Sequence, residues 1–399
     1  MKLADIAEYA TDKISSSDIS LAEYVTTDSL LQNRRGRETA QNLPPVTCTL
    51  INYRPGDVLV ANIRPYLKKV WQADTEGGSS SDVLVFRAKN GHSSKFLYAV
   101  LLQDSFFAYA MQGAKGSKMP RGDKGQIMRY ELPTFTPKEE ENIGNMMVDI
   151  VSKINVNRQI NDNLEAMAKQ LYDYWFVQFD FPNEEGKPYK SSGGAMVWNE
   201  KLKREIPQEW SNGVLSDVAN ITMGQSPDGS SYNENGEGII FYQGSTDFGL
   251  RFPAVRQYTT SPSRYANKGD ILMSVRAPVG ALNIANNDCC IGRGLSALSS
   301  KIGSMTHLYY LMNDFRLKFE GMNSAGTTFG SITKDELFNL PVVIPTKSII
   351  SKFEKVCEPI FDKQMIIGEE INALTKQRDE LLPLLMNGQA TVNYHLSAY

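Results

Sequence analysis

The sequence contains two closely similar segments, GDVLVANIRPYL at 56–67 and GDILMSVRAPVG at 269–280, which are offset by 213 residues. Each begins with Gly-Asp and continues into an apolar run, a pattern typical of a tight turn that leads into a β-strand. The chain has 399 residues, more than one ordinary domain core requires, so two similar halves fit within it. The repeat therefore predicts an internal duplication, and this constrains the fold more than any single motif does.

The similarity extends to both sides of these segments. LADIA at 3–7 corresponds to LSDVA at 215–219, so each half opens on the same alternation of apolar and polar residues. Further along, LPTFTP at 132–137 corresponds to LPVVIP at 340–345, with the same spacing between the two prolines. Each half is therefore expected to end its folded domain on a short, proline-bounded strand.

Within each half, short apolar runs alternate with Gly, Ser, Asn and Pro, as in SDVLVFRA at 81–88 and GIIFYQGSTDFG at 238–249. This pattern is typical of short strands joined by turns. Two longer apolar stretches, 94–111 and 305–322, occupy equivalent places in the halves and predict helices. Each half is thus predicted to be an α+β domain with a β-rich core.

A long helical pattern follows each domain. Apolar residues recur at alternating steps of four and three from Ile143 to Trp175 and from Phe353 to Leu385, a narrow stripe that favours coiled-coil packing. Helices of this length, about 55 Å, must extend between domains. Four polar residues in the stripes, Asn157, Asn161, Gln364 and Arg378, either set the register or mark exposed helix ends. The apolar seam comprises Ile143, Met147, Ile150, Ile154, Leu164, Leu171, Phe353, Ile360, Ile367, Ile371, Leu374, Leu381 and Leu385.

Cap signals set the expected boundaries. Thr136-Pro137 followed by three glutamates favours a helix start, and Asn387-Gly388 favours a helix end. The segment between the first long helix and the second domain is rich in Pro, Gly and Ser; it is either a plain spacer or, as Trp198 and Trp210 suggest, a locally packed segment. The expected divisions are a first domain at 1–136, a helix at 137–180, a linker at 181–213, a second domain at 214–345, a helix at 346–388 and a tail at 389–399.

Composition argues against several classes of protein. No stretch approaches the roughly 18 apolar residues that span a bilayer, and the start of the chain lacks a secretory signal pattern, so no membrane partner and a cytoplasmic location are expected. The four cysteines include no CxxC pair and the three histidines no HExxH spacing, so no metal site is expected. A GxxxxGK phosphate loop, a glycine-rich turn for S-adenosylmethionine and an amino-methylation box are all missing. The sequence therefore predicts recognition, with no catalytic residues.

Several longer stretches together resemble the specificity (S) subunits of type I restriction-modification enzymes: residues 181–210, MGQSPDGSSYN at 223–233, residues 269–295 and residues 324–345. The resemblance implies two target recognition domains joined by two helices that pack as an antiparallel coiled coil, with a pseudo-twofold relation between the repeats. It further implies a non-catalytic subunit in which each domain reads one half of a bipartite target in double-stranded DNA. The coiled coil then sets the spacer between the half-sites.

The resemblance also implies partners and cofactors. Members of this family assemble with methylation (M) subunits, two of them, which bind S-adenosylmethionine and modify adenine, and with restriction (R) subunits, which use ATP and cut DNA. S-adenosylmethionine, ATP and Mg²⁺ are therefore expected on the partners, and no cofactor on this chain. One alternative stays open: an interaction scaffold whose twin domains on a coiled coil bind protein instead of DNA.

Candidates for DNA contact are basic and polar residues in predicted loops, because Arg can read guanine and Gln adenine, while Lys mostly contacts phosphate. In the first domain they are Arg34, Arg35, Arg37, Arg64, Lys68, Lys69, Lys115, Lys118, Arg121 and Lys124. In the second they are Gln225, Ser226, Tyr242, Gln243, Ser245, Arg276, Arg293, Thr327 and Thr328. The net charges of +3 for residues 1–136 and −1 for 211–345 predict weak sequence-independent affinity for the free chain, so that the M subunits would supply much of the phosphate contact.

Overall fold

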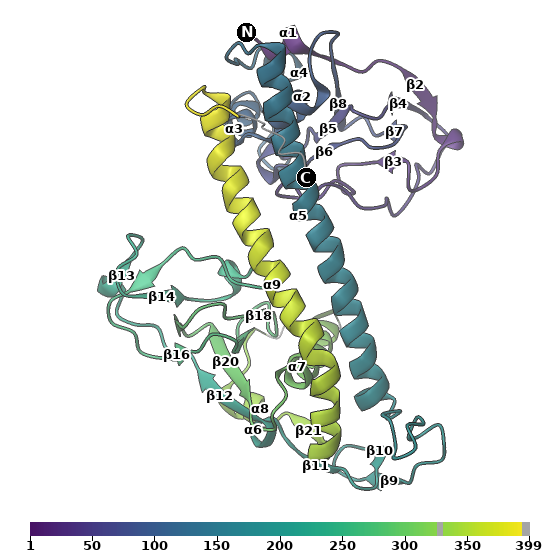
Figure 1. The fold of residues 1–399 in the computed structure, drawn as a ribbon, viewed down its shortest axis with the longest axis vertical. Helices are drawn as coiled ribbons and strands as arrows, with labels where there is room; N and C mark the ends of the chain where they lie inside the picture. The colour runs from purple at the N-terminus through teal and green to yellow at the C-terminus, as the bar shows by residue number, and fades with distance from the viewer. Residues whose placement is uncertain (325–329, 393–399) are drawn as a thin grey trace, which may run out of the picture. The chain divides into compact units, whose positions relative to one another are not determined.

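The structure is a computed structural model that describes residues 1–324 and 330–392. The chain divides into two compact units, which we call unit 1 (residues 1–158 with 370–399) and unit 2 (residues 159–369). Each unit contains small β-sheets, short helices and part of two long helices, α5 (Pro137–Tyr172) and α9 (Lys347–Met386) (Figure 1). The fold is thus of the mixed helix and strand kind. Within the described ranges, no helix is both long and apolar enough to cross a membrane.

Unit 1 is built on two four-stranded sheets. The first has the order β1 (Ala7–Tyr9), β8 (Val83–Ala88), β5 (Val58–Ala61), β6 (Val70–Gln72), and all its neighbours are antiparallel. The second has the order β2 (Lys13–Ser15), β4 (Thr49–Tyr53), β7 (Gly77–Ser79), β3 (Tyr24–Val25), and only β3 and β7 are parallel. Four short helices complete the unit: α1 (Leu3–Ile6), α2 (Ser94–Leu102), α3 (Asp104–Gln112) and α4 (Lys124–Ile127).

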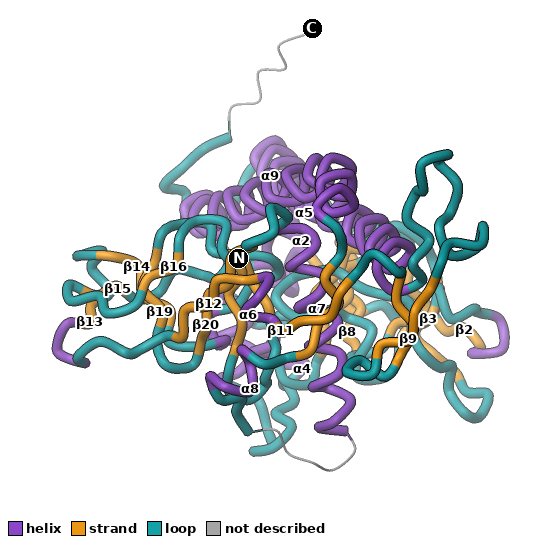
Figure 2. The backbone as a smooth tube through the Cα atoms, turned by 90° about the horizontal axis from the view of Figure 1, so that it is seen from below, coloured by secondary structure: helices purple, strands orange, loops and turns teal. Residues whose placement is uncertain are grey.

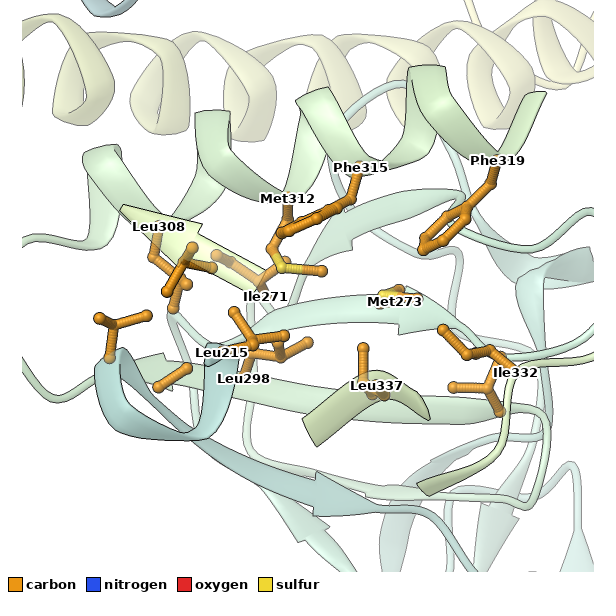
Figure 3. Packing of buried hydrophobic residues seen from close by; sticks show 14 of the residues in the cluster. Leu215, Ile271, Met273, Leu298, Leu308, Met312, Phe315, Phe319, Ile332 and Leu337 are labelled. Atoms are coloured by element: carbon orange, nitrogen blue, oxygen red, sulfur yellow. The ribbon is translucent and has the colours of Figure 1, made fainter. Parts of the chain in front are cut away.

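Unit 2 repeats the first of these sheets, with the order β12 (Ala219–Met223), β20 (Leu295–Ser300), β17 (Ile271–Ser274), β18 (Leu282–Ile284). The helix α7 (Met305–Ser324) lies over this sheet and packs Leu308, Met312 and Phe315 toward it (Figure 3). The second sheet has the order β13 (Tyr232–Asn233), β15 (Tyr258–Thr259), β14 (Ile239–Tyr242), β19 (Cys289–Ile291), β16 (Tyr265–Ala266). Figure 2 shows the short helices α6 (Leu215–Val218) and α8 (Lys334–Phe338) near β12 and β20 of the first sheet.

The second sheets of the two units share a three-stranded centre but differ at their edges. In unit 1, β7 precedes β8 in the chain and pairs antiparallel with β4 and parallel with β3. In unit 2, β19 precedes β20 and pairs antiparallel with β16 and parallel with β14. Unit 1 adds β2 next to β4, whereas unit 2 adds β15 and β13 next to β14. The extra strands therefore extend opposite edges of the same central arrangement.

The repeated Gly-Asp pairs form the predicted turns. Gly56 and Gly269 have φ angles of 91° and 93°, a left-handed conformation that glycine adopts readily and other residues rarely do. The aspartate carboxylates close the turns by accepting a hydrogen bond from a backbone amide three residues earlier, at 2.9 Å from Arg54 to Asp57 and at 2.8 Å from Asn267 to Asp270. The strands β5 and β17 begin at the next residue in each unit.

The expected helix at 94–111 is interrupted. Gln103 has extended backbone angles, and its side-chain amide donates to the carbonyl of Val100, so α2 ends before it and α3 begins after it. The equivalent helix α7 runs on without a break. The interruption places Asp104 at the start of α3, where it accepts hydrogen bonds from two cationic side chains described below.

The two proline-bounded segments also differ. LPVVIP forms the strand β21 (Pro341–Ile344), which pairs with β11 (Ser211–Val214). LPTFTP forms no strand, so the expected strand is wrong here; only its first residue, Leu132, exchanges backbone hydrogen bonds with Met1, at 2.8 and 2.7 Å, next to an isolated bridge between Lys2 and Glu131. In unit 2 the pairing of β11 with β21 covers four positions, whereas in unit 1 the corresponding contacts join residues 1–3 to residues 130–132 and do not reach beyond Leu132.

The cap signals of the long helices are confirmed. Thr136 and Glu139 exchange hydrogen bonds between their side chains and backbone amides at the start of α5, and Gly388 has a φ of 76° just beyond the end of α9. Every residue of the two predicted stripes is buried or half-buried. The helix α5 continues beyond Tyr172 into one π-helical turn at Asp173–Val177.

Polar and aromatic contacts join α5 to α9 within each unit. In unit 1 the Asn157 amide donates to Glu370 at 2.8 Å. In unit 2 the Gln364 amide donates to Glu165 at 2.9 Å, and the ring of Phe353 lies 5.5 Å from that of Trp175. In unit 2 the two helices therefore run in opposite directions. One polar residue of the stripes bonds to the facing helix in each unit, Asn157 in unit 1 and Gln364 in unit 2.

The linker packs locally through one of its two tryptophans. Trp210 is buried and stacks on Phe181, with ring centroids 4.9 Å apart. Trp198 lies in a hairpin of β9 (Met196–Asn199) and β10 (Arg204–Pro207), and 53% of its surface is exposed. A local structure, and not a plain spacer, therefore fills this part of unit 2.

Candidate nucleic-acid interface

In unit 2, three glycine-containing loops converge on the side chain of Gln243. Its amide group and the Ser226 hydroxyl are hydrogen-bonded to each other at 2.9 Å, and the backbone amide of Arg293 donates to the same hydroxyl at 3.3 Å. A side chain at Gly292 would lie only 2.9 Å from the Gln243 amide, so glycine is needed for this close approach. The loops thus hold Gln243 at the surface, beside the exposed Gln225 and Arg293 and the half-buried Ser245.

A basic hollow of about 400 Å³ adjoins these loops. Arg276, Arg293 and Lys334 line it, and its described lining includes no acidic side chain. The strand-like pairing of Arg276 with Ser331 brings the loop after β17 next to the start of α8. Thr327 and Thr328 lie outside the described residues. Two of the arginines predicted from the sequence are therefore brought together, with a lysine that the prediction omitted.

Tyr242 is a different case. Its side chain is 1% exposed, and burial raises the pKa of its hydroxyl. No hydrogen-bond partner of this hydroxyl occurs among the described residues. Its position in the core of the second sheet suits packing rather than contact with a nucleic acid.

The corresponding corner of unit 1 carries Arg64, Arg121 and Lys124. Arg64 is exposed, while Arg121 pairs with Asp82 at 2.7 Å. Lys124 is exposed and lies 6.0 Å from the centre of the Tyr9 ring. Arg121 bridges the backbones of Ile63 and Lys115, so the loop that follows β5, the 115–121 loop and the start of α4 are adjacent. Lys115 and Lys118 are exposed in the same loop.

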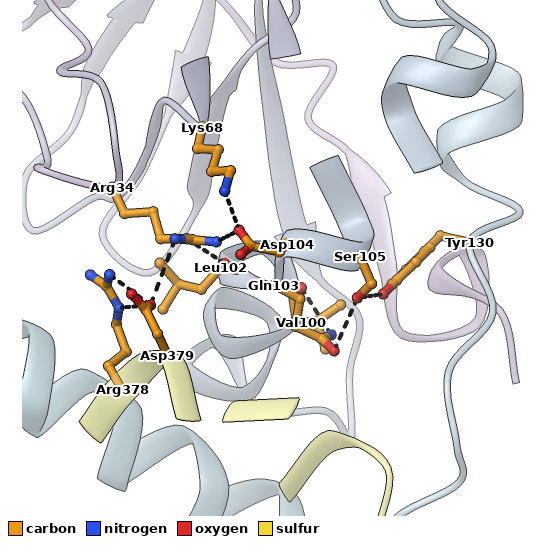
Figure 4. A network of polar contacts seen from close by, with 10 residues as sticks. All are labelled: Arg34, Lys68, Val100, Leu102, Gln103, Asp104, Ser105, Tyr130, Arg378 and Asp379. Carbon is orange, nitrogen blue, oxygen red and sulfur yellow. Dashed lines mark hydrogen bonds and ion pairs between the residues drawn. The ribbon is translucent and has the colours of Figure 1, made fainter. Parts of the chain in front are cut away.

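Three other candidates of unit 1 have structural contacts, and Figure 4 draws two of them, Arg34 and Lys68. Arg34 is buried, donates to the carbonyl of Leu102 at 2.5 Å and pairs with Asp104, which also binds Lys68 at 2.6 Å. Lys69 donates to the carbonyl of Thr27, and burial lowers the pKa of Lys69. These contacts favour a structural role for Arg34 and Lys69.

The two remaining arginines of that segment differ from each other. The Arg37 guanidinium lies over the Trp71 ring, 4.3 Å from its centroid, and donates to the carbonyl of Ala22 at 2.6 Å. Arg35 is exposed. Of the RRGR segment at 34–37, Arg35 is therefore the residue that is most open to a partner.

The two basic corners are built from equivalent loops of the repeat. Arg64 and Arg276 each lie in the loop after β5 or β17, one position apart in the repeat, since Arg276 pairs as Ile63 does in unit 1. Lys124 and Lys334 are equivalent, as the first residues of α4 and α8. The helices are capped alike, with the side chains of Asp123 and Thr333 accepting from the amide three residues on. Extending the alignment of the halves to this helix would have identified Lys334 as the partner of Lys124.

Comparison with known proteins agrees with this geometry. Residues 207–381 match the family model described as the type I restriction modification DNA specificity domain. The chain is 32% identical over 276 residues to a putative type I restriction enzyme MjaX specificity subunit of Methanocaldococcus jannaschii, covering 67% of this chain and 61% of that protein. It is 24% identical to the MjaIX specificity subunit of the same organism, covering 95% of this chain and 86% of the relative. The crystal structure of an S subunit from M. genitalium shares the fold, with a TM-score of 0.62 at 15% identity, over 97% of this chain and 95% of that one.

Proposed function

Because this chain belongs to the family of type I restriction-modification specificity subunits, we propose that it recognises a bipartite sequence in double-stranded DNA, one half-site per unit. The observation that carries the proposal is that equivalent loops of both units bring an arginine and a lysine together in a basic corner. Arg64 with Lys124 and Arg276 with Lys334 are suited to contact phosphate or guanine. The loops around these pairs differ in sequence and in added strands, as two readers of different half-sites require.

The role proposed for this chain is recognition without catalysis. The relatives are named as specificity subunits. In this proposal methylation and cleavage belong to partner subunits: two M subunits that bind S-adenosylmethionine, and R subunits that use ATP and Mg²⁺. The M subunits would also contact the DNA backbone, because residues 211–345 of unit 2 have a net charge of −1. A free chain that bound random duplex tightly at physiological salt would contradict this division of labour.

We further propose that α5 and α9 form one antiparallel coiled coil that sets the spacer. The buried stripes and the contacts of Asn157 with Glu370 and of Gln364 with Glu165 support this packing. The recognition domains would then be residues 1–136 and 214–345, related by a pseudo-twofold axis and joined by the helices at 137–180 and 346–388. The linker at 181–213 and the tail at 389–399 complete this arrangement. A stiff coil could place two readers about 34–36 Å apart, one turn of DNA.

An exchange of domains tests the function. Residues 1–136 are replaced by the same domain of a relative, the hybrid is expressed with its methylation partners, and methylated bases are mapped by single-molecule sequencing. We expect one half of the methylated sequence to change and the other half to persist. An unchanged pattern would favour the interaction scaffold instead.

A further inference from the structure

Unit 1 contains two loops whose backbones are held in an unfavourable conformation. Asn33 and Arg34 have φ angles of 57° and 60°, and Arg64 and Lys68 have φ angles of 52° and 51°. Residues with a Cβ rarely adopt this left-handed region, and such residues cluster at functional sites, where surrounding contacts maintain them. Four of the six non-glycine residues of this kind among the described residues lie in these two loops.

The two loops are bonded to each other. The amide of Asn33 donates to the carbonyl of Leu67, and that of Arg34 to the carbonyl of Lys68, both at 2.9 Å. The amide of Arg64 donates to the carbonyl of Pro120 at 2.7 Å. The pairing of Lys68 and Arg34 with Asp104 fixes the loops on α3 (Figure 4). The loop at 63–69 is therefore held in place by backbone bonds at Arg64, Leu67 and Lys68 and by the ion pair of Lys68 with Asp104.

This rigid loop presents an aromatic ring to solvent. Tyr66 is the middle residue of a one-turn 3₁₀ helix, Pro65–Leu67, and 51% of its surface is exposed. Among the described residues, no ring contact or hydrogen bond involves its side chain, and Arg64 beside it is likewise exposed without a side-chain partner. Because the backbone beneath it is already held by other contacts, the ring is accessible to a partner without rearrangement of the loop.

Unit 2 has no such ring at the equivalent place. Its loop after Arg276 reads Ala-Pro-Val-Gly, and Val279 is buried in the core beneath α7. No residue of the 276–280 loop has a positive φ except Gly280. The exposed tyrosine therefore distinguishes the two basic corners, although both carry an arginine and a lysine.

We propose that Tyr66 stacks on a base that is unstacked within the half-site of unit 1, while Arg64 contacts the adjacent phosphate or guanine. The proposal rests on the DNA-recognition function proposed above and names the residue that gives unit 1 its own mode of reading. Aromatic rings stack on bases, and side chains inserted at a base step kink and unstack the duplex. Because the loop is already ordered, little conformational freedom is lost when the ring is inserted.

The test uses the full chain in complex with its methylation partners and the target found by sequencing. Tyr66→Ala is compared with Tyr66→Phe, which keeps the ring, and with Trp198→Ala, a similarly exposed aromatic residue in the linker hairpin. We expect Tyr66→Ala to weaken target binding about 5- to 100-fold, while the other two variants bind within about twofold of the wild type. The salt dependence should stay the same, because the ring carries no charge.

A second measurement reports stacking directly. 2-Aminopurine is placed in turn at each position of the unit 1 half-site, and its emission is recorded with and without the complex. Apart from the adenine that the M subunit takes out of the stack, the wild type and Tyr66→Phe should raise the emission at one further position, and Tyr66→Ala should lose that signal. Tyr66→Ala with wild-type affinity and an unchanged 2-aminopurine signal would overturn the inference. A wild-type complex with no preference for any bipartite sequence would instead refute the proposed function, so the two failures are distinguishable.

Discussion

The Gly-Asp turn has the same backbone conformation in both units, but its aspartate is paired with a cation in unit 1 and lies near another carboxylate in unit 2. In unit 1 the side chain of Asp57 is 4% exposed and accepts two hydrogen bonds from the Arg87 guanidinium, at 2.9 and 2.7 Å. In unit 2 the strand register puts Ser299 at the position of Arg87. Burial, together with the nearby carboxylate of Asp288, raises the pKa of Asp270. Both halves of the repeat have the turn, but only unit 1 has the arginine that neutralises its aspartate.

The difference teaches that the turn depends on the aspartate's bond to its own backbone and not on an ion pair. Arg87 has a second task in unit 1, because it also binds Asp12 at 2.8 Å, just before β2 of the other sheet. Unit 2 adds its extra strands at the opposite edge of that sheet. Arg87 therefore supports the pairing of β2 with β4, which only unit 1 has.

Of the substitutions that test this difference between the units, removal of Arg87 should change the free energy of unfolding most. Arg87→Met leaves the buried Asp57 and the nearby Asp12 without their shared cation, and we expect a loss of about 3 kcal/mol in the free energy of unfolding of unit 1. Denaturant unfolding followed by the emission of Trp71, the one tryptophan of unit 1, measures it. The matched variant Ser299→Ala in unit 2 should change stability by less than about 0.5 kcal/mol. Equal effects of the two variants would show that Arg87 has no special role.

Neutralising the two turn aspartates should give effects of opposite sign. Asp57→Asn weakens the two charged hydrogen bonds with Arg87, and we expect it to destabilise unit 1 by about 2 kcal/mol. Asp270→Asn keeps an oxygen for the turn and removes a half-buried charge whose pKa is raised, so unit 2 should become slightly more stable at neutral pH. The reporter for unit 2 is labelling of its buried thiols, Cys289, Cys290 and Cys357. Destabilisation of unit 2 by Asp270→Asn would mean that the charge itself supports the turn.

The two units should also respond differently to acid. The folded-state pKa of Asp270 is raised, so the folded unit 2 takes up this proton before the unfolded chain does, and this group adds stability as pH falls through the raised value. In unit 1 the hydrogen bond from Arg87 lowers the pKa of Asp12, so its contribution is lost as Asp12 becomes protonated at low pH. The difference in stability between the wild type and Asp270→Asn, measured by thiol labelling from pH 7 downward, isolates the first effect. A difference independent of pH would contradict it.

Local patterns made the repeated elements predictable. A glycine with positive φ before an apolar run identifies the turn, and residue spacing identifies the stripes of α5 and α9, because both depend on near neighbours in the chain. The strand β21 and the segment 132–137 look alike in sequence, but a strand depends on pairing with a distant segment: β21 pairs with β11 over four positions, whereas the segment 132–137 pairs at Leu132 alone.

Long-range contacts made the site less predictable. Arg34 and Arg35 are adjacent and chemically identical, yet Arg34 is buried against Leu102 and Asp104, which lie about 70 residues away. Tyr66 was not selected from the sequence because its exposure depends on how the loop at 33–34 holds its backbone. Lys334 was not predicted for a simpler reason: the similarity between the halves was traced through the strands and not through the short helices α4 and α8. Charge and residue type locate a surface, but only tertiary contacts decide which side chains remain open.

The smallest effect concerns Asp82, which pairs with Arg121 in unit 1 and corresponds to Gly294 in unit 2. Asp82→Gly makes the first corner resemble the second and frees the Arg121 guanidinium for phosphate. Because the pair is largely solvent-exposed, stability should change by less than about 1 kcal/mol. Affinity for random duplex should rise a few-fold, and the slope of log affinity against log salt should steepen by about one, as expected for one added phosphate contact. Fluorescence anisotropy at several salt concentrations measures both, and the double variant Asp82→Gly/Arg121→Ser, which carries the unit 2 residues at both positions, should restore the original slope. If the slope of the single variant stays at the wild-type value, Arg121 does not face the DNA, and the likeness of the two corners is limited to the lysine at the start of the short helix and the arginine of the loop after β5 or β17.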